Sequence, residues 1–173
     1  MQGLLARQSR AQPLYTAEQR QRRDASRWTL VQGLLAPIQF AVFLISVALV
    51  TRFLLTGAGE TAATVSIIVK TLVLYTIMIT GAIWEKDVFG QYLFAPAFYW
   101  EDMVSMLVLA LHTAYLASAI FGLISVEAQM WLALAAYATY VINAAQFVYK
   151  LRLARLDSRN APQRSARYVE AAE

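Results

Sequence analysis

Four of the eleven acidic residues of this chain bracket one short segment that is rich in aromatic side chains. Glu85 and Asp87 precede the segment, and Glu101 and Asp102 follow it. Paired carboxyl groups can serve as the proton donor and the proton acceptor of general acid–base catalysis. The rings between them form either an aromatic belt at the lipid headgroups or a docking surface for a flat ligand, and they are Phe89, Tyr92, Phe94, Phe98, Tyr99 and Trp100.

The acidic residues lie at opposite ends of predicted helices, and this difference bears on their protonation. Glu101 and Asp102 begin a predicted helix, where the helix dipole favours a charged carboxylate. Glu85 ends the preceding helix beside Trp84 and lipid, where the dipole and the loss of hydration both favour the neutral acid. We therefore expect Glu85 to donate a proton and Glu101 or Asp102 to accept one.

The single histidine of the chain, His112, lies near the middle of a predicted membrane helix. An ionisable side chain within a membrane span is costly, and it is a functional candidate by default. Glu101 lies eleven residues earlier, which is close to three full turns, so that Glu101, Ser105 and His112 share one helical face. Tyr115 follows His112 by one turn. We therefore count His112 among the candidate catalytic residues.

A polar stripe runs along the last predicted span. Tyr140, Asn143, Gln146 and Lys150 follow one another at spacings of three, three and four residues, which places them on one face of a helix. Asn143 and Gln146 either contact a substrate or join helices through hydrogen bonds, a common role for such residues in membranes. For Lys70, in an earlier span, interhelical hydrogen bonding or snorkelling toward the outer membrane face is the better explanation.

The composition sets the kind of protein that must position these residues. The 173-residue chain is 59% hydrophobic and only 15% charged, and its mean hydropathy is positive. Soluble domains carry about 25% charged residues, so the composition disfavours a soluble enzyme with a polar shell and a disordered chain. The absence of cysteine excludes disulfides, cysteine-ligated metals and a thiol nucleophile. With one histidine, we expect no metal centre of the protein's own.

Four apolar windows predict an all-α membrane protein with a bundle of four transmembrane helices. Each window exceeds the roughly 20 residues that cross a hydrocarbon core. The windows cover residues 28–55, 61–84, 103–125 and 128–149, separated by turns at Gly57–Glu60 and Val126–Glu127 and by a loop at 85–102. We divide the chain into a basic N-terminal tail (1–27), a catalytic membrane domain (28–155) and a basic C-terminal tail (156–173).

The net charge of +4 reflects 15 basic and 11 acidic residues, and the basic residues concentrate in the two tails. Six lie in the first 27 positions, and six lie from Lys150 onward. Nucleic-acid binding is disfavoured because no aromatic side chains alternate with these arginines. Basic segments that flank apolar spans instead mark the cytoplasmic side. Both termini and the 85–102 loop are therefore expected in the cytoplasm.

Several long segments of the chain resemble the 3-vinyl bacteriochlorophyllide hydratases, a family of membrane enzymes in bacteriochlorophyll synthesis. The resemblance covers about residues 14–155 and is carried by Arg23–Gly33, Ala36–Pro37, Ile83–Gly90, Phe94–Asp102, Leu109–Tyr115 and Ala136–Phe147. It implies the addition of water to the 3-vinyl group of chlorophyllide a or a bacteriochlorophyllide, which gives a 3-(1-hydroxyethyl) group. It also implies a multi-pass protein of the inner or intracytoplasmic membrane of a phototrophic bacterium.

The chemistry of that reaction assigns roles that the resemblance does not supply. A proton adds to the terminal vinyl carbon, the macrocycle delocalises the cation, and water attacks the inner carbon, so no redox or nucleotide cofactor is expected. Glu85 would supply the proton, Glu101 or Asp102 would be the base, and His112 would orient the acid or bind the substrate's magnesium. Lys86 or nearby arginines would hold the propionate. The expected substrate-binding residues are Trp84, Lys86, Tyr99, Trp100, Tyr115, Asn143 and Gln146.

A non-catalytic pigment carrier or an assembly factor of photosynthetic complexes is the alternative function. In that case His112 would bind magnesium and the aromatic loop would be the docking surface. A small transporter is disfavoured because no pair of broken helices faces a charge pair at the midplane. The expected partners are the pigment, water, the lipid bilayer and other enzymes of pigment synthesis, without nucleic acid.

Overall fold

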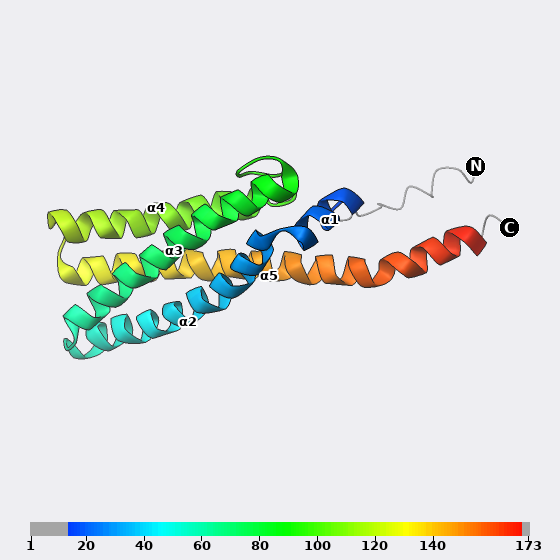
Figure 1. Cartoon of the computed structure of the whole chain (residues 1–173). Helices are drawn as coiled ribbons and strands as arrows, with labels where there is room; N and C mark the ends of the chain where they lie inside the picture. Colours follow the sequence, from blue (N-terminus) through cyan, green and yellow to red (C-terminus); the bar gives the residue numbers. More distant parts are fainter. Residues whose placement is uncertain (1–13, 171–173) are drawn as a thin grey trace, which may run out of the picture.

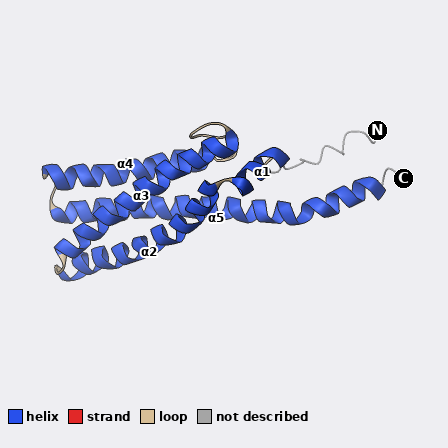
Figure 2. Cartoon of the chain, in the orientation of Figure 1, coloured by secondary structure: helices blue, strands red, loops and turns tan. Residues whose placement is uncertain are grey.

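In the computed structural model, residues 14–170 are described, and their side chains are described for residues 14–156. All regular structure within these residues is helical, and short loops and turns join the helices (Figure 2). The all-α fold predicted from the sequence is confirmed. The five helices are α1 (Ala17–Ala25), α2 (Arg27–Thr56), α3 (Glu60–Phe89), α4 (Tyr99–Phe121) and α5 (Val126–Glu170).

Four of these helices are long and apolar enough to cross a membrane: α2, α3, α4 and the part of α5 from Val126 to Leu156. Large hydrophobic side chains on their outer faces point away from the protein. Leu30, Leu55 and Ile120, for example, are 79%, 79% and 73% exposed. Exposing apolar surface to water costs about 25 cal/mol per Å², and contact with lipid removes that cost. The outer surface is therefore that of a membrane protein.

The four long helices form two antiparallel hairpins. α2 packs along α3, and α4 packs along α5, whereas fewer contacts join α2 to α5 and α3 to α4. The loop at 90–98, which connects the hairpins, lies at the same end of the bundle as α1 and the projecting part of α5 (Figure 1). The turns after α2 and α4 lie at the opposite end (Figure 1). This is the arrangement that an even number of crossings requires.

The loop between α3 and α4 is shorter than the sequence predicted. α3 continues through Phe89 and ends at Gly90, which has a φ of 85°, and α4 begins at Tyr99. The charged residues that closed the apolar window still belong to α3, because Glu85 and Val88 are one turn apart and both face the interior. The loop therefore spans residues 90–98, and the predicted span of 85–102 is wrong at both ends.

The turn between α4 and α5 lies earlier than the predicted turn at Val126–Glu127. α4 ends at Phe121, because Gly122 adopts a left-handed conformation with a φ of 60°. α5 begins at Val126, and the Ser125 hydroxyl accepts a hydrogen bond from the backbone N–H of Ala128 at 3.3 Å. A glycine thus ends α4 although the apolar pattern of the sequence continues past it.

The interior of the bundle combines aromatic packing with polar side chains. Phe43 of α2 packs against Tyr137 and Tyr140 of α5, with ring centroids 5.5 and 5.0 Å apart. Ser46 Oγ lies 2.6 Å from the hydroxyl of Tyr137. These contacts join the first hairpin to the second where their helices otherwise touch little.

A smaller aromatic cluster closes the end of the bundle that carries the 90–98 loop. Tyr15, just before α1, is 3% exposed, and its ring stacks on Phe89 at 5.7 Å and lies 6.4 Å from Phe98. The Arg23 guanidinium lies 4.8 Å from the Tyr15 ring centroid. The start of α1 is therefore held against the end of α3, next to the acidic residues.

The predicted basic tails lie only partly within the described residues. Positions 1–13 and 171–173, and the side chains of 157–170, lie outside them. Within the described part, residues 17–25 of the N-terminal tail form α1, and residues 156–170 continue α5 beyond the other helices (Figure 1). The division into two tails and a catalytic domain stays a prediction.

Candidate active site

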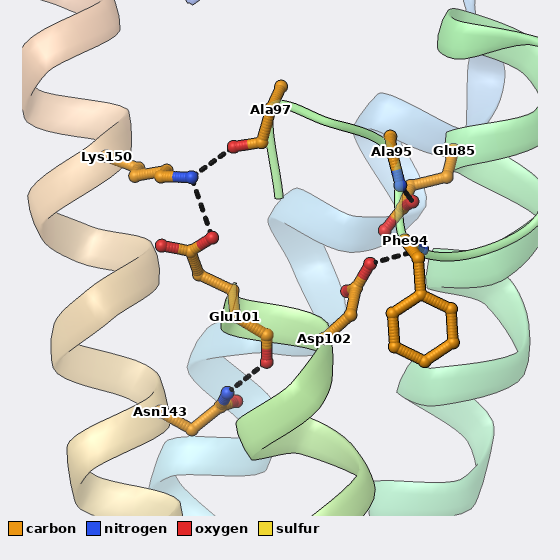
Figure 3. Close-up of polar contacts among 8 residues, drawn as sticks. All are labelled: Glu85, Phe94, Ala95, Ala97, Glu101, Asp102, Asn143 and Lys150. Carbon is orange, nitrogen blue, oxygen red and sulfur yellow. Dashed lines mark hydrogen bonds and ion pairs between the residues drawn. The ribbon is translucent and has the colours of Figure 1, made fainter. Parts of the chain in front are cut away.

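Glu85 and Asp102 form a buried pair of carboxyl groups beneath the 90–98 loop. Glu85 lies in the last turn of α3, Asp102 lies in the first turn of α4, and their exposed fractions are 4% and 3%. The loop covers them and donates two backbone hydrogen bonds. The N–H of Ala95 donates to Glu85 Oε2 at 3.2 Å, and the N–H of Phe94 donates to Asp102 Oδ2 at 2.7 Å (Figure 3).

The two carboxyl groups also lie close enough to interact with each other. A carboxylate can only accept a hydrogen bond, so a bond between two carboxyl groups requires a proton on one of them. A proton held by the pair would make one group the donor and the other the acceptor. The sequence predicted Glu101 or Asp102 as the partner of Glu85; the structure places Asp102 beside Glu85, and the roles of acid and base stay a prediction.

The backbone of the loop is bent to reach this pair. Phe94 has a φ of 60°, and it is the one residue other than glycine with a positive φ in the described part of the chain. The left-handed conformation costs a bulky residue about 1–2 kcal/mol. It directs two consecutive N–H groups, those of Phe94 and Ala95, at two different carboxyl groups. Such strain commonly occurs where a site is pre-organised.

Glu101, by contrast, is bound to α5. Its carboxylate forms an ion pair with Lys150 Nζ at 2.7 Å, and its backbone carbonyl accepts a hydrogen bond from Asn143 Nδ2 at 2.8 Å (Figure 3). Lys150 also donates to the carbonyl of Ala97 and lies 5.2 Å from the ring centroid of Phe98. Glu101 therefore fixes α4 against α5, and Asp102 is the acidic residue of this turn that faces Glu85.

The polar stripe on α5 is divided between two levels of the bundle. Asn143 and Lys150 contact Glu101, and Asn143 Oδ1 also accepts a hydrogen bond from Ser105 Oγ at 3.2 Å. Tyr140 lies deeper and packs on Phe43. Gln146 is half-buried, and its Oε1 has no hydrogen-bond partner among the described residues. Asn143 thus joins helices, which is one of the two roles the sequence left open.

His112 and Tyr115 lie away from the carboxyl pair. His112 follows Asp102 by ten residues, which is about 15 Å along a helix. Both side chains are 0% exposed, and His112 Nδ1 donates to the carbonyl of Val108 at 2.8 Å. The structure therefore does not bring these two predicted site residues together with the acids. No cluster of three or more His, Asp or Glu side chains that could hold a metal ion occurs among the described residues.

The aromatic residues near the loop divide into buried and exposed groups. Trp84 packs against Phe89 and Phe98, and its Nε1 donates to Thr29 Oγ1 at 2.9 Å, so this ring supports the fold. Tyr99 and Trp100 are 45% and 69% exposed at the start of α4. Their rings, with that of Phe94 packed on Tyr99 at 5.8 Å, form an exposed aromatic surface beside the carboxyl pair.

Lys86, the predicted propionate-binding lysine, lies on the exposed side of the loop. Its Nζ donates to the carbonyl of Gly90 at 2.7 Å and lies 5.5 Å from the ring centroid of Tyr92.

Sequence reasoning missed three other contributors to the site. The stripe on α5 included Lys150 but gave no sign of its ion pair, and no side-chain pattern could reveal the backbone donors of Phe94 and Ala95.

The ion pair between Glu101 and Lys150 leads to a stability prediction. Replacing Lys150 by methionine leaves a nearly buried carboxylate without its cation, which typically costs about 3–5 kcal/mol, and the 23% exposure of the Lys150 side chain places this pair at the lower end. We expect a lower Tm in detergent by thermal unfolding. The additional change Glu101→Gln should restore most of the loss, because the amide carries no charge.

Arg152→Met, which removes an exposed positive charge two residues further along α5, is the matched control and should leave the Tm unchanged. A double variant of Lys150→Met and Glu101→Gln that is no more stable than Lys150→Met alone would contradict the assignment of the pair.

Comparison with known proteins identifies the family. The family model of 2-vinyl bacteriochlorophyllide hydratase matches residues 15–153, which include every residue of the site described above. The chain belongs to the 2-vinyl bacteriochlorophyllide hydratase family. The vinyl position numbered 3 in current tetrapyrrole nomenclature is numbered 2 in the older one, so the resemblance found in the sequence is confirmed.

Two curated relatives carry the name of this family. A 2-vinyl bacteriochlorophyllide hydratase of Cereibacter sphaeroides is 69% identical over 144 residues, which are 83% of this chain and 89% of the relative. One of Rhodobacter capsulatus is 66% identical over 145 residues, which are 84% of each chain. No solved structure matches this member of the hydratase family.

Proposed function

We propose that this protein adds water to the vinyl group of a bacteriochlorophyllide and gives a 1-hydroxyethyl group. The observation that carries the proposal is the buried pair of Glu85 and Asp102, whose carboxyl groups lie beside each other at one end of a membrane bundle. Hydration of an alkene needs one proton donor and one proton acceptor close together. The curated relatives are named for the same reaction.

Within the pair, Glu85 carries the proton and Asp102 carries the negative charge. Asp102 lies at the start of α4, where the helix dipole favours an anion, and it accepts the shorter of the two backbone hydrogen bonds, at 2.7 Å against 3.2 Å. Glu85 lies at the end of α3, where the dipole disfavours an anion. Glu85 is therefore the acid of the reaction, and Asp102 is the base.

In the first step, Glu85 protonates the terminal carbon of the vinyl group. The π electrons form the new C–H bond, and the positive charge on the inner carbon is delocalised into the macrocycle. In the second step, a water oxygen attacks the inner carbon while Asp102 accepts a proton from that water. The proton then returns from Asp102 to the neighbouring Glu85, which restores the starting state after the net addition of H and OH.

The remaining predicted site residues take supporting roles in this proposal. Tyr99 and Trp100 offer ring faces to the macrocycle, since both are exposed next to the carboxyl pair. Glu101 is a positioning residue, because its ion pair with Lys150 fixes the turn of α4 that carries Asp102. His112 lies too deep to orient Glu85, because it follows Asp102 by about 15 Å along α4.

We infer that the protein spans the inner or intracytoplasmic membrane with both termini and the 90–98 loop in the cytoplasm. Lys and Arg concentrate in the segments before α2 and after the membrane part of α5, which lie at one end of the bundle. Such segments stay on the cytoplasmic side. The carboxyl pair would then take its water from the cytoplasmic surface of the membrane.

An isotope experiment tests the hydration directly. The detergent-solubilised full chain is incubated with 3-vinyl bacteriochlorophyllide in water labelled with oxygen-18, or in deuterium oxide. We expect the product to gain one labelled oxygen, or one non-exchangeable deuterium on the methyl carbon, by mass spectrometry. A pigment that binds in stoichiometric amount but keeps its mass would overturn the hydratase proposal and support the alternative of a pigment carrier.

A further inference from the structure

Three polar side chains deep in the bundle take no part in the chemistry at the loop. They are Gln39 of α2, Lys70 of α3 and His112 of α4, and their exposed fractions are 2%, 0% and 0%. Lys70 Nζ, His112 Nε2 and both amide atoms of Gln39 have no hydrogen-bond partner among the described residues. Buried polar atoms are hydrogen-bonded in nearly all folded proteins, so these atoms point to a ligand.

Lys70 contributes a buried amino group with free donors. Its Nζ lies 3.9 Å from the ring centroid of Tyr140, and this cation–π contact stabilises the charged form without supplying a hydrogen-bond acceptor. The ion pairs within the described side chains involve other basic residues. Interhelical hydrogen bonding and snorkelling, the two explanations that the sequence favoured for Lys70, are therefore both wrong.

His112 contributes an acceptor next to this donor. Its Nδ1 donates to the carbonyl of Val108, so the neutral ring carries its lone pair on Nε2. The His112 ring lies 5.8 Å from the ring of Tyr137, which is one turn before the Tyr140 ring that Lys70 Nζ contacts, so α5 brings the two residues to the same level of the bundle. Three tyrosines surround the two residues: Tyr137 lies beside the His112 ring, Tyr140 contacts Lys70, and the buried Tyr115 follows His112 by one turn of α4. No carboxyl group of the described side chains lies among them.

A carboxyl group matches this combination of donor and acceptor. Its carbonyl oxygen can accept a hydrogen bond from Lys70 Nζ, and its hydroxyl can donate to His112 Nε2; a carboxylate binds equivalently when the proton resides on Nε2. Gln39 lies one turn before Phe43, which packs on Tyr140, and its amide adds a further donor and acceptor on the side toward the loop. A chloride ion has no hydrogen to donate to Nε2.

We propose that Lys70 and His112, with Gln39 nearby, form a binding site for a carboxyl group, and that this group is the propionic side chain of the pigment. The second half of the proposal rests on the proposed function, because a bacteriochlorophyllide carries this side chain as a free acid. The site lies about 15 Å from Asp102 along α4, which is comparable with the span from the vinyl group to the propionic carboxyl across the macrocycle.

A lipid-facing groove leads toward this site. It lies between α2 and α5, has a volume of about 390 Å³, and is lined by Phe40, Tyr140, Val141, Ala144, Ala145 and Val148. Tyr140 borders the groove and also contacts Lys70, so its ring separates the ammonium group from the groove. A pigment dissolved in the bilayer can therefore approach with its macrocycle in the apolar groove and pass its carboxyl group beside Tyr140.

The first experiment tests the site without pigment or activity. Thermal unfolding of the full chain in detergent is followed as sodium formate, the smallest carboxylate, or sodium chloride replaces sodium sulfate at constant ionic strength. We expect a saturable rise in Tm with formate and none with chloride. Lys70→Met should abolish the rise, and Arg52→Met, which removes an exposed charge from α2, should preserve it.

His112→Phe provides a second variant, because it keeps the ring that packs on Tyr137 and removes Nε2. It should also abolish the response to formate. The proposal is overturned if formate leaves the Tm of the unaltered chain unchanged, or if the rise persists in both variants. An equal rise with chloride would overturn the assignment to a carboxyl group. These outcomes do not depend on hydration, so the two proposals can fail separately.

The second experiment identifies the source of the carboxyl group. Binding of bacteriochlorophyllide and of its methyl ester is titrated by absorbance. We expect the free acid to bind about 10- to 100-fold more tightly than the ester, as for a charge-assisted hydrogen bond, and Lys70→Met to abolish this preference while the ester binds as before. If Lys86→Met abolishes the preference and Lys70→Met does not, the carboxyl group binds at the loop and the proposal is wrong.

Discussion

Replacing Glu85 by glutamine is expected to lower kcat for hydration by about 10²- to 10⁴-fold, the usual contribution of a positioned acid. The fold should survive, because the amide oxygen can still accept from the N–H of Ala95 and the amide nitrogen can donate to Asp102. Glutamine thus copies the protonated acid in shape and hydrogen bonding but has no proton to transfer to carbon. Turnover is measured by the blue shift of the pigment's long-wavelength absorption band, which follows when the vinyl group leaves conjugation with the macrocycle.

The matched control is Asp87→Asn, which removes an exposed carboxyl group two residues further along α3 and should leave kcat unchanged. Pigment affinity and the Tm of the Glu85→Gln variant should stay within about twofold and a few degrees of those of the unaltered chain. Full activity of this variant would remove Glu85 from the mechanism. A collapse of the Tm would show that the carboxyl group serves folding.

Replacing Asp102 by asparagine is expected to lower kcat by a similar factor but to leave the first step intact. Without a base for water, the protonated pigment returns its proton to Glu85 and reverts to the vinyl compound. In deuterium oxide the acid carries deuterium, so the vinyl group should gain deuterium at its terminal carbon without gaining water. The measurement is the mass of the recovered substrate together with the yield of product.

Glu85→Gln should show neither deuterium exchange nor hydration, because both need the acid. The combined variant should be no slower than the slower single variant, since the two groups act as one unit. The opposite pattern, exchange in Glu85→Gln and none in Asp102→Asn, would reverse the assignment of acid and base. Glu60→Gln, an exposed change at the other end of α3, should behave like the unaltered chain.

The membrane helices could be predicted from hydropathy, because a bilayer allows few alternatives to a helix. The residues at which the helices end could not be predicted, because tertiary contacts decide them. A span of 20 or more apolar residues has few alternatives to a membrane helix. The end of α3, however, depends on Glu85 finding a backbone donor in the loop, which keeps an ionisable side chain in the interior. The end of α4 depends on the conformation of Gly122, which hydropathy does not register.

The candidate site was predictable to the level of helix ends and no further. The sequence placed Glu85, Glu101 and Asp102 near one another but could not choose between the last two. Consecutive residues on a helix point about 100° apart, so the rotation of α4 decides which one meets Glu85 and which one meets Lys150. That rotation follows from packing against α5, which no pattern in α4 encodes.

The two carboxyl groups proposed as acid and base belong to different hairpins, Glu85 to the hairpin of α2 and α3 and Asp102 to that of α4 and α5. Neither hairpin therefore contains both carboxyl groups of the proposed proton transfer. Activity should therefore depend on how the two hairpins pack against each other. A bilayer of unsuitable thickness, or a neighbouring protein that separates the hairpins, would abolish activity while every helix stayed intact.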